Sequence, residues 1–256
     1  MSEPPPDAIL LQATAFTHQG AVRARNEDTV AVGDWVMSRP MDQPRILERI
    51  VEAPIVCLVA DGMGGHAAGD IASRFVAECL AERAAEATDS ASLAELMRMV
   101  DRGLFEQMDE QPALLGMGTT VAGLHVCPRG LSAFNVGDSR TYRIEATGLV
   151  QLSTDDTPGP KTADGRTALR KTPIMSQALG GHRPAEDFVP HVLEEPIDDH
   201  HYLICSDGVT DLLDVGTMFD LITDDDAQTA TALFDESMAA GGHDNISIVL
   251  VRIRRA

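Results

Sequence analysis

The stretch APIVCLVAD at residues 53–61 constrains the fold of this chain more than any other. It is apolar almost throughout and rich in β-branched residues, without alternation of polar and apolar positions. Such a run is typical of a strand that is covered on both faces. The chain is therefore expected to build a layered structure with this strand inside it.

The other predicted elements come in blocks of strands and pairs of helices. Strands are expected at 11–17, 29–36, 53–61, 119–126, 131–137, 140–146, 188–193, 201–207 and 245–253. Helices are expected at 70–86, 92–108, 215–223 and 227–239. The prolines within 37–53 favour a loop or short helix there. Because strands and helices do not alternate along the chain, the pattern predicts an α+β layered sandwich and not a doubly wound sheet.

Length and composition favour one folded domain. The 256 residues contain no internal repeat, and a flexible, proline-rich tip at 1–10 is expected to precede a domain at 11–256. No apolar run approaches the roughly 20 residues that span a bilayer. The N-terminus does not resemble a secretory signal, and four scattered cysteines favour buried, reduced thiols in the cytoplasm. The net charge of −20 argues against nucleic-acid and anionic-membrane binding.

Acidic residues recur where apolar runs end next to Gly or Asn. The positions that share this pattern are Asp61, Asp138, Asp207 and Asp244, and a further acidic pair is Glu27 and Asp28. A single Asp-Gly after a strand is usually only a turn. Five such places in one chain instead favour convergence, and converging carboxylates repel each other unless cations lie between them. All-oxygen ligands suit Mg²⁺ or Mn²⁺ better than zinc.

The short sequence motifs around these acids show a resemblance to a known family. They are, in order, GAVRARNED (20–28), VADGMGGHAAGD (59–70), GTT (118–120), NVGDSR (135–140), LSTD (152–155), ALG (178–180), CSDGVTD (205–211) and DNIS (244–247). This set resembles the metal-dependent PPM/PP2C-type serine/threonine protein phosphatases in their bacterial form, and it spans nearly the whole chain. The resemblance implies a four-layer α/β/β/α sandwich of two antiparallel sheets flanked by helix pairs, with a binuclear Mn²⁺/Mg²⁺ centre at one end.

The resemblance also implies a role for individual residues. Asp61 would bridge the two metals, Glu27 and the Gly62 carbonyl would bind one of them, and Asp28 would hold its waters. Asp207 and Asp244 would bind the other ion. Asp138 would help Asp207 to hold a weaker third ion, and Arg23 would bind the substrate phosphate. Water held between two ions is a suitable nucleophile for phosphate esters, and the guanidinium of Arg23 could contact two phosphate oxygens. Cys205 lies beside a proposed ligand but is expected to be a packed core thiol and not a nucleophile.

Several positions depart from the family pattern or stay open. His18 and Asp156 stand where the family usually has Asp and often has His, and Asp70 replaces a more common Glu. The general acid is either His66 or a metal-bound water, and His66 could equally serve only to hydrogen-bond a loop carbonyl. His243 could support Asp244 from the outer side.

The segment 157–176 occupies the place of the family's mobile flap. It holds the basic residues Lys161, Arg166, Arg170 and Lys171. They either attract acidic phosphopeptides to an otherwise negative protein or form an ordinary solvated loop.

The sequence thus predicts a Mn²⁺/Mg²⁺-dependent phosphatase, expected to be a cytoplasmic monomer. Its substrates would be proteins phosphorylated on Ser or Thr by a cognate Ser/Thr kinase. Two alternatives are a catalytically weak, PP2C-like phosphoprotein-binding module and a phosphoesterase for small phosphate esters. The complete set of carboxylates counts against the binding module.

Overall fold

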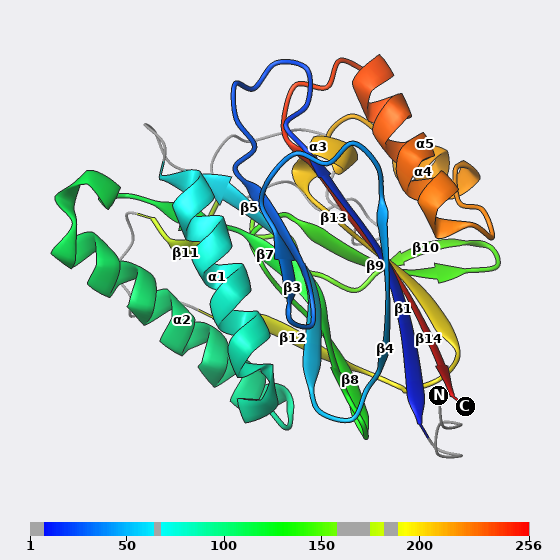
Figure 1. Ribbon diagram of the computed structural model, residues 1–256, viewed down its shortest axis with the longest axis horizontal. Coiled ribbons are helices and arrows are strands. Elements are labelled where there is room, and N and C mark those ends of the chain that lie inside the picture. The colour runs from blue at the N-terminus through cyan, green and yellow to red at the C-terminus, as the bar shows by residue number, and fades with distance from the viewer. Residues whose placement is uncertain (1–7, 64–67, 158–174, 182–188, 256) are drawn as a thin grey trace.

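The computed structural model describes residues 8–63, 68–157, 175–181 and 189–255 of the chain. Two antiparallel sheets pack face to face, and helices cover the outer face of each (Figure 1). The predicted four-layer α/β/β/α sandwich is therefore confirmed. β1 begins at Ile9, inside the expected tip at 1–10, of which residues 1–7 lie outside the described part. The division into a tip and a domain stays a prediction.

The first sheet has six strands in the order β10-β9-β13-β14-β1-β4. Their bounds are Gly148–Gln151 (β10), Arg140–Glu145 (β9), His200–Cys205 (β13), Ile246–Arg255 (β14), Ile9–His18 (β1) and Arg45–Ile50 (β4). β1 and β14 pair over their full lengths, from Ile9 opposite Arg255 to His18 opposite Ile246. The start of β1 and the end of β14 therefore lie together at one edge of the sandwich (Figure 1).

The second sheet has eight strands and carries the APIVCLVAD run at its centre. Six of them follow the order β11-β6-β5-β7-β8-β12, and β2 pairs with both β5 and β3. Their bounds are Leu179–Gly180 (β11), Gly118–Thr119 (β6), Ile55–Met63 (β5), Val121–Cys127 (β7), Gly130–Val136 (β8), His191–Glu195 (β12), Asp28–Val32 (β2) and Trp35–Met37 (β3).

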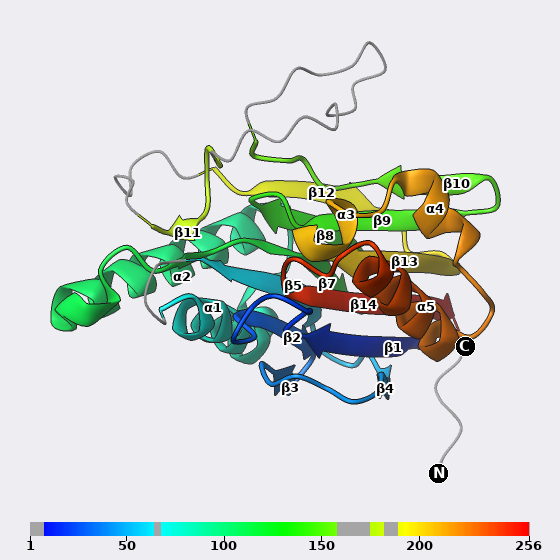
Figure 2. The ribbon, with the colours of Figure 1, turned by 90° about the horizontal axis from the view of Figure 1, so that it is seen from above.

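Two helical layers close the sandwich. The second sheet is covered by α1 (Gly69–Arg83) and α2 (Ser90–Glu110), which are followed by 3₁₀ turns at Ala84–Glu86 and Pro112–Leu114. The first sheet is covered on the opposite side by α4 (Val215–Asp220) and α5 (Asp226–Ala239), with the short α3 (Asp207–Thr210) beside them (Figure 2). Asp89 begins α2 with a capping box, because its carboxylate accepts from the Ser92 amide while the Ser92 hydroxyl accepts from the Asp89 amide.

Three apolar clusters hold the layers together. One lies between the second sheet and α1 and α2, one between the two sheets, and one between the first sheet and α4 and α5. Both faces of β5 are buried in these clusters, as its sequence predicts, since Leu58 faces the helices and Val59 faces the other sheet. These layers fix the strand ends where the acidic residues stand.

Some predicted elements were wrong in detail. The expected strand 29–36 is a hairpin, because Gly33 turns the chain at φ +58° between β2 and β3. Part of the expected loop at 37–53 forms edge strand β4, which buries Leu47 but leaves Ile46 and Ile50 exposed. The apolar residues of RILERI do not alternate with polar ones, so the sequence does not indicate a strand there, and its partner β1 is distant in sequence. The short strands β10 and β11 were not predicted either.

Candidate metal centre

The predicted acidic residues lie at one edge of the sandwich, where six strands begin or end. Antiparallel pairing places the end of β1 beside the start of β14, the end of β13 beside both β14 and the start of β9, and the end of β5 beside the start of β2. The start of β1 and the end of β14, which are close to the two termini of the chain, lie at the opposite edge. Residues distant in sequence are thus brought into one region by strand register.

Asp28 and Asp61 are direct cross-strand neighbours in this region. Asp28 is fully buried, and its Oδ2 accepts a hydrogen bond of 2.6 Å from the Ser247 hydroxyl. Its Oδ1 is buried without a hydrogen-bond partner among the described residues. A buried carboxylate oxygen without a donor is costly for a protein, and a cation or an ordered water would satisfy it.

Glu27 is fixed by its backbone. Its amide donates to Asn245 Oδ1 at 2.8 Å, and its carbonyl accepts from Ser73 Oγ at 2.6 Å and from the Gly62 amide at 3.2 Å. Its half-buried side chain interacts electrostatically with Asp70 and Asp244.

Asp61 is held through its carbonyl. That carbonyl accepts from Thr119 Oγ1 at 2.8 Å and from the Thr120 amide at 2.9 Å. The following glycine is required by close backbone contact, since a Cβ on Gly62 would lie 2.2 Å from the Gly69 carbonyl oxygen. Gly208, after Asp207, is constrained in the same way by the Asn245 carbonyl at 1.9 Å. These glycines therefore make room for neighbouring backbone.

Electrostatics couple the acids into one group. Burial raises the pKa of Asp61 well above its ordinary value, and the charges of Asp28, Asp207, Asp244 and Asp138 add to the rise. Burial, followed by Asp207, raises the pKa of Asp138 to about 7. Burial also raises the pKa of Asp28 to about 7, with Asp207 again contributing and the Ser247 hydrogen bond opposing. Several acids whose ionisation is mutually disfavoured provide a field that attracts cations.

Arg23 lies among these acids and forms an ion pair with one of them, Asp244. Its Nη2 is 2.6 Å from Asp244 Oδ2, and this bond raises the pKa of Arg23. About half of the Arg23 side chain is exposed (53%). Burial, and then the Asp70 charge, raises the pKa of Glu27, whereas Arg23 opposes the rise.

The donor set fits hard divalent cations. It consists of carboxylate and carbonyl oxygens, as Mg²⁺ and Mn²⁺ prefer, and it includes the unpartnered Asp28 oxygen. Within the described ranges, no three His, Cys, Asp or Glu side chains form a group that could hold a metal ion as they stand. Mg²⁺ is commonly bound by only one or two protein carboxylates and keeps several of its waters.

Other predicted residues have structural surroundings. His18 Nδ1 accepts from the Gly20 amide at 3.0 Å, and its ring packs on Phe234. Cys205 is fully buried, which raises the pKa of its thiol to about 12, so the structure supports core packing. His243 is exposed, with its ring close to Gly241. His66 and the basic residues at 161, 166, 170 and 171 lie outside the described residues.

Sequence reasoning missed the residues that orient the acids. Asn245 bonds Glu27 and also donates to the carbonyls of Gln19 at 3.0 Å and Arg25 at 2.9 Å. Ser247 bridges Asp28 and Thr17. Both lie in the DNIS motif at 244–247, but nothing in the sequence indicated which residues they would contact.

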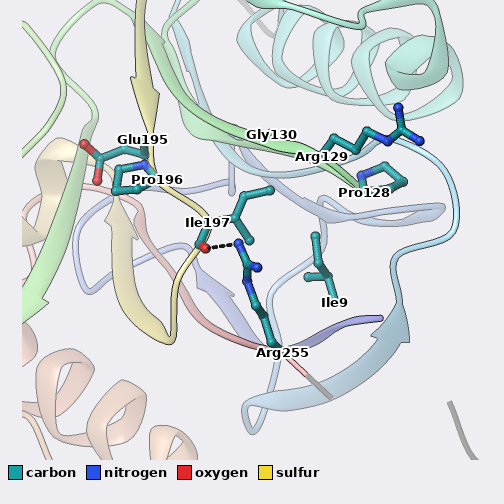
Figure 3. A pocket seen from close by; sticks show the side chains of 8 residues that line it. All are labelled: Ile9, Pro128, Arg129, Gly130, Glu195, Pro196, Ile197 and Arg255. Carbon is teal, nitrogen blue, oxygen red and sulfur yellow. Dashed lines mark hydrogen bonds between the residues drawn. The ribbon is translucent and has the colours of Figure 1, made fainter. Parts of the chain in front are cut away.

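A hollow of about 440 Å³ lies at the opposite edge of the sandwich (Figure 3). Ile9, Pro128 and Ile197 form part of its wall, and the Arg255 side chain donates to the Ile197 carbonyl. The Arg129 side chain points away from it (Figure 3). None of the predicted site residues lines this hollow, so it is separate from the acidic edge.

Comparison with known proteins identifies the family. The profile of the protein phosphatase 2C family matches residues 47–245, which is most of the chain. The chain belongs to the protein phosphatase 2C family. Membership agrees with the position of the acids, since the matched region carries Asp61, Asp138, Asp207 and Asp244 on this one edge.

Bacterial serine/threonine phosphatases are among the relatives of this protein phosphatase 2C chain. It is 28% identical to the serine/threonine protein phosphatase PstP of Mycobacterium tuberculosis over 96% of its own length and 45% of PstP, so it spans about half of that relative. It is 29% identical to the serine/threonine phosphatase stp of Listeria welshimeri, covering 94% of this chain and 95% of that one. A solved PstP catalytic domain in complex with two manganese ions superposes with a TM-score of 0.77 at 29% identity, covering 96% of this chain and 99% of that domain.

No helix in the parts of the chain that the structure describes is long and apolar enough to cross a bilayer.

Proposed function

We propose that this protein is a Mn²⁺- or Mg²⁺-dependent phosphatase that hydrolyses phosphoserine and phosphothreonine in proteins. The carrying observation is the group of carboxylates at one edge of the sandwich. Burial and mutual repulsion raise the pKa values of several of them. One of them, Asp28, has a buried carboxylate oxygen without a hydrogen-bond partner among the described residues. The similar PstP catalytic domain was solved in complex with two manganese ions, which supports a metal-dependent activity for this chain.

The acids divide into groups by the strand ends that carry them. Glu27 and the Gly62 carbonyl would hold one ion, Asp207 and Asp244 the other, and Asp61 would contact both. Asp28 would hold water beside the first ion through its unpartnered oxygen. Asp138 would hold a weaker third ion together with Asp207, whose charge contributes to the raised pKa of Asp138. When bound, two such ions supply an activated water and neutralise charge on the phosphoryl oxygens.

Arg23 would orient the substrate phosphate. It is permanently charged and about half exposed, and its planar fork can donate two hydrogen bonds to phosphate oxygens. Its ion pair with Asp244 keeps the guanidinium at the acidic edge. A phosphate would compete with Asp244 for this fork, whereas a cation bound to Asp244 would release it.

The wider role follows from this chemistry. The substrates would be proteins phosphorylated by a Ser/Thr kinase of the same cell, and we propose that the phosphatase acts as a cytoplasmic monomer without nucleic-acid or membrane partners. The general acid for the leaving alkoxide would be His66 or a metal-bound water, and the basic residues between 161 and 171 would attract acidic phosphopeptides.

Turnover of two substrates by the purified chain tests the proposal. Hydrolysis of p-nitrophenyl phosphate and of a phosphothreonine peptide would be measured with Mn²⁺, Mg²⁺ or EDTA. We expect metal-dependent turnover of both substrates and its loss in Asp207→Asn. The matched control is Asp220→Asn, the same change at an exposed position on α4, which we expect to behave as wild type.

Two results would contradict the proposal. Turnover of p-nitrophenyl phosphate without the peptide would indicate a phosphoesterase for small esters. Absence of turnover, with Mn²⁺ binding shown by calorimetry, would indicate a phosphoprotein-binding module.

A further inference from the structure

Asp156 is a buried acid outside the proposed metal ligands, at a position where the sequence departs from its family. It is 7% exposed, and its carboxylate receives three polar contacts. Oδ2 accepts from the Gly137 amide at 2.9 Å, and Oδ1 accepts from Gln177 Nε2 at 2.9 Å and lies 2.8 Å from His191 Nε2. Its own amide donates to the Gly137 carbonyl at 3.0 Å, so Asp156 and Gly137 are bonded in both directions.

Gly137 immediately precedes Asp138, and its conformation is fixed. Its φ is +98°, and a Cβ there would lie 2.6 Å from the Thr120 side chain, so only glycine fits. On the other side of Asp138, Ser139 Oγ is 2.7 Å from Thr120 Oγ1. The Asp138 backbone is thus held from both sides, by the Asp156 carboxylate before it and by the contact between Ser139 and Thr120 after it.

The residues before Asp156 bind the same turn. Thr154 and Asn135 exchange two hydrogen bonds, with the Thr154 amide 2.9 Å from Asn135 Oδ1 and Asn135 Nδ2 2.7 Å from the Thr154 carbonyl. The Asp155 carboxylate accepts hydrogen bonds from both Nε and Nη2 of Arg140. Thr154, Asp155 and Asp156 therefore contact Asn135, Arg140 and Gly137, respectively. Of these three contacts, only that of Asp156 involves the residue directly before Asp138.

His191 and Gln177 complete the surroundings of the buried carboxylate. A buried carboxylate needs donors, and here these are an amide N–H, a side-chain amide and an imidazole. Gln177 is itself held by two bonds to the Val189 backbone. His191 is one-third exposed (32%) and borders a surface hollow of about 370 Å³, so shortening its side chain creates no sealed cavity.

We infer that Asp156 is a positioning residue, which orients Asp138 toward the acidic edge through the Gly137 amide and is itself oriented by His191. This rests on the proposed function, since Asp138 is a metal ligand only under that proposal. Residues that orient ligands in this way commonly change metal affinity by about 10- to 100-fold when they are replaced.

Calorimetric titration of the full chain with Mn²⁺ tests the inference without relying on turnover. In Asp156→Ala, we expect the affinity of the weakest resolved Mn²⁺ site to fall about tenfold or more. Asp156→Asn also removes the charge but keeps an oxygen for the Gly137 amide, and should stay within about threefold of wild type. Asp226→Ala removes a buried carboxylate at the start of α5, which pairs with Arg252 toward the end of β14 that is remote from the acidic edge, and should lower thermal stability without changing Mn²⁺ affinity.

Turnover of p-nitrophenyl phosphate provides a second readout. In Asp156→Ala, kcat should fall at limiting Mn²⁺ and recover at excess Mn²⁺, with KM within about twofold of wild type, because a positioning defect weakens metal binding and not substrate binding. A folded Asp156→Ala that binds Mn²⁺ like wild type overturns the inference. So does an equal loss in Asp156→Asn, since the preserved acceptor would then be irrelevant.

A second variant decides the case in which Asp156→Ala does not fold. His191→Ala keeps the Gly137 bond but removes one donor, and a fall in Mn²⁺ affinity of about threefold or more supports the inference, whereas wild-type affinity overturns it. Failure of the proposed function is distinguishable, because wild type would then lack metal-dependent turnover while the titrations still compare the variants.

Discussion

Arg23 and Asp244 form an ion pair between two segments separated by 221 positions in sequence, with Arg23 Nη2 2.6 Å from Asp244 Oδ2. Arg23 lies in the loop after β1, and Asp244 lies two positions before the start of β14. The full-length pairing of β1 with β14 brings these two segments together. One residue proposed to bind phosphate is thereby held beside one proposed to bind metal.

Loss of Arg23 should weaken catalysis at the level of phosphate binding. For Arg23→Ala we expect kcat/KM for the phosphothreonine peptide to fall about 10- to 100-fold, since a hydrogen bond to a charged group contributes roughly 1.5–3 kcal/mol. Arg23→Lys keeps the charge without the fork and should be intermediate. Steady-state kinetics at saturating Mn²⁺ measures both. The control is Arg25→Ala, an exposed arginine two positions on, and equal losses at both positions would contradict a specific role for Arg23.

Asn245 should be needed for both stability and metal affinity. Asn245→Ala leaves the Glu27 amide and the carbonyls of Gln19 and Arg25 without their partner, so we expect a loss of about 2 kcal/mol in the free energy of unfolding. Because Glu27 is displaced, Mn²⁺ affinity should fall as well. Urea unfolding and calorimetry measure the two effects. Thr229→Val on α5 removes the hydroxyl that accepts a hydrogen bond from the Thr223 amide, and it should lower stability only.

Asp61, Asp138 and Asp207 could be singled out from the sequence because each follows a recognisable apolar run, and their role as metal ligands stays a prediction. Antiparallel neighbours alternate in direction, so the strand order of the two sheets, and not the apolar runs alone, brings Asp61 and Asp207 to the same end of the sandwich. The orienting partners could not be predicted. The bonds of Ser247 to Asp28 and of His191 to Asp156 join residues 219 and 35 positions apart, and depend on register that no local pattern specifies. The same holds for β4, whose strand character comes from pairing with β1.

Acid should release a stabilising ion pair remote from the metal edge. Burial alone would raise the pKa of Asp226, but bonds from His201 on β13 and Arg252 on β14 more than offset it, so that the pKa is lowered. A lowered folded-state pKa means that the unfolded chain binds the proton more readily. The stabilisation is therefore complete above the unfolded pKa of about 3.9 and is lost as pH falls through the lower folded value.

Asp226→Asn should remove this pH dependence. We expect its free energy of unfolding to be about 1–3 kcal/mol lower than wild type at neutral pH, with a smaller difference at about pH 2–3. Urea unfolding across this range measures it. The exposed neighbour variant Asp224→Asn serves as control, and a difference that is constant with pH would show that the carboxylate charge is not responsible.

The thiol of Cys205 should be dispensable for turnover. It is fully buried, and burial raises its pKa to about 12, so the thiolate is scarce at neutral pH. Cys205→Ala should retain kcat/KM within about threefold while stability falls by about 1 kcal/mol. Loss of turnover with an intact fold and unchanged Mn²⁺ affinity would instead indicate a thiol mechanism.

Gly62 should tolerate no side chain, because of backbone contact. A Cβ there would lie 2.2 Å from the Gly69 carbonyl oxygen and 2.5 Å from the Glu27 carbonyl oxygen, and the Glu27 backbone cannot move without shifting a proposed ligand. Gly62→Ala should therefore cost about 1–3 kcal/mol or more and weaken Mn²⁺ binding. Gly130→Ala is the matched control, since its Cβ would meet nothing within 4 Å. Thermal unfolding and Mn²⁺ titration of both variants measure the difference. If Gly62→Ala were as stable as Gly130→Ala and bound Mn²⁺ normally, the glycine after Asp61 would not be explained by close packing, and clearance for water and substrate would be the better account.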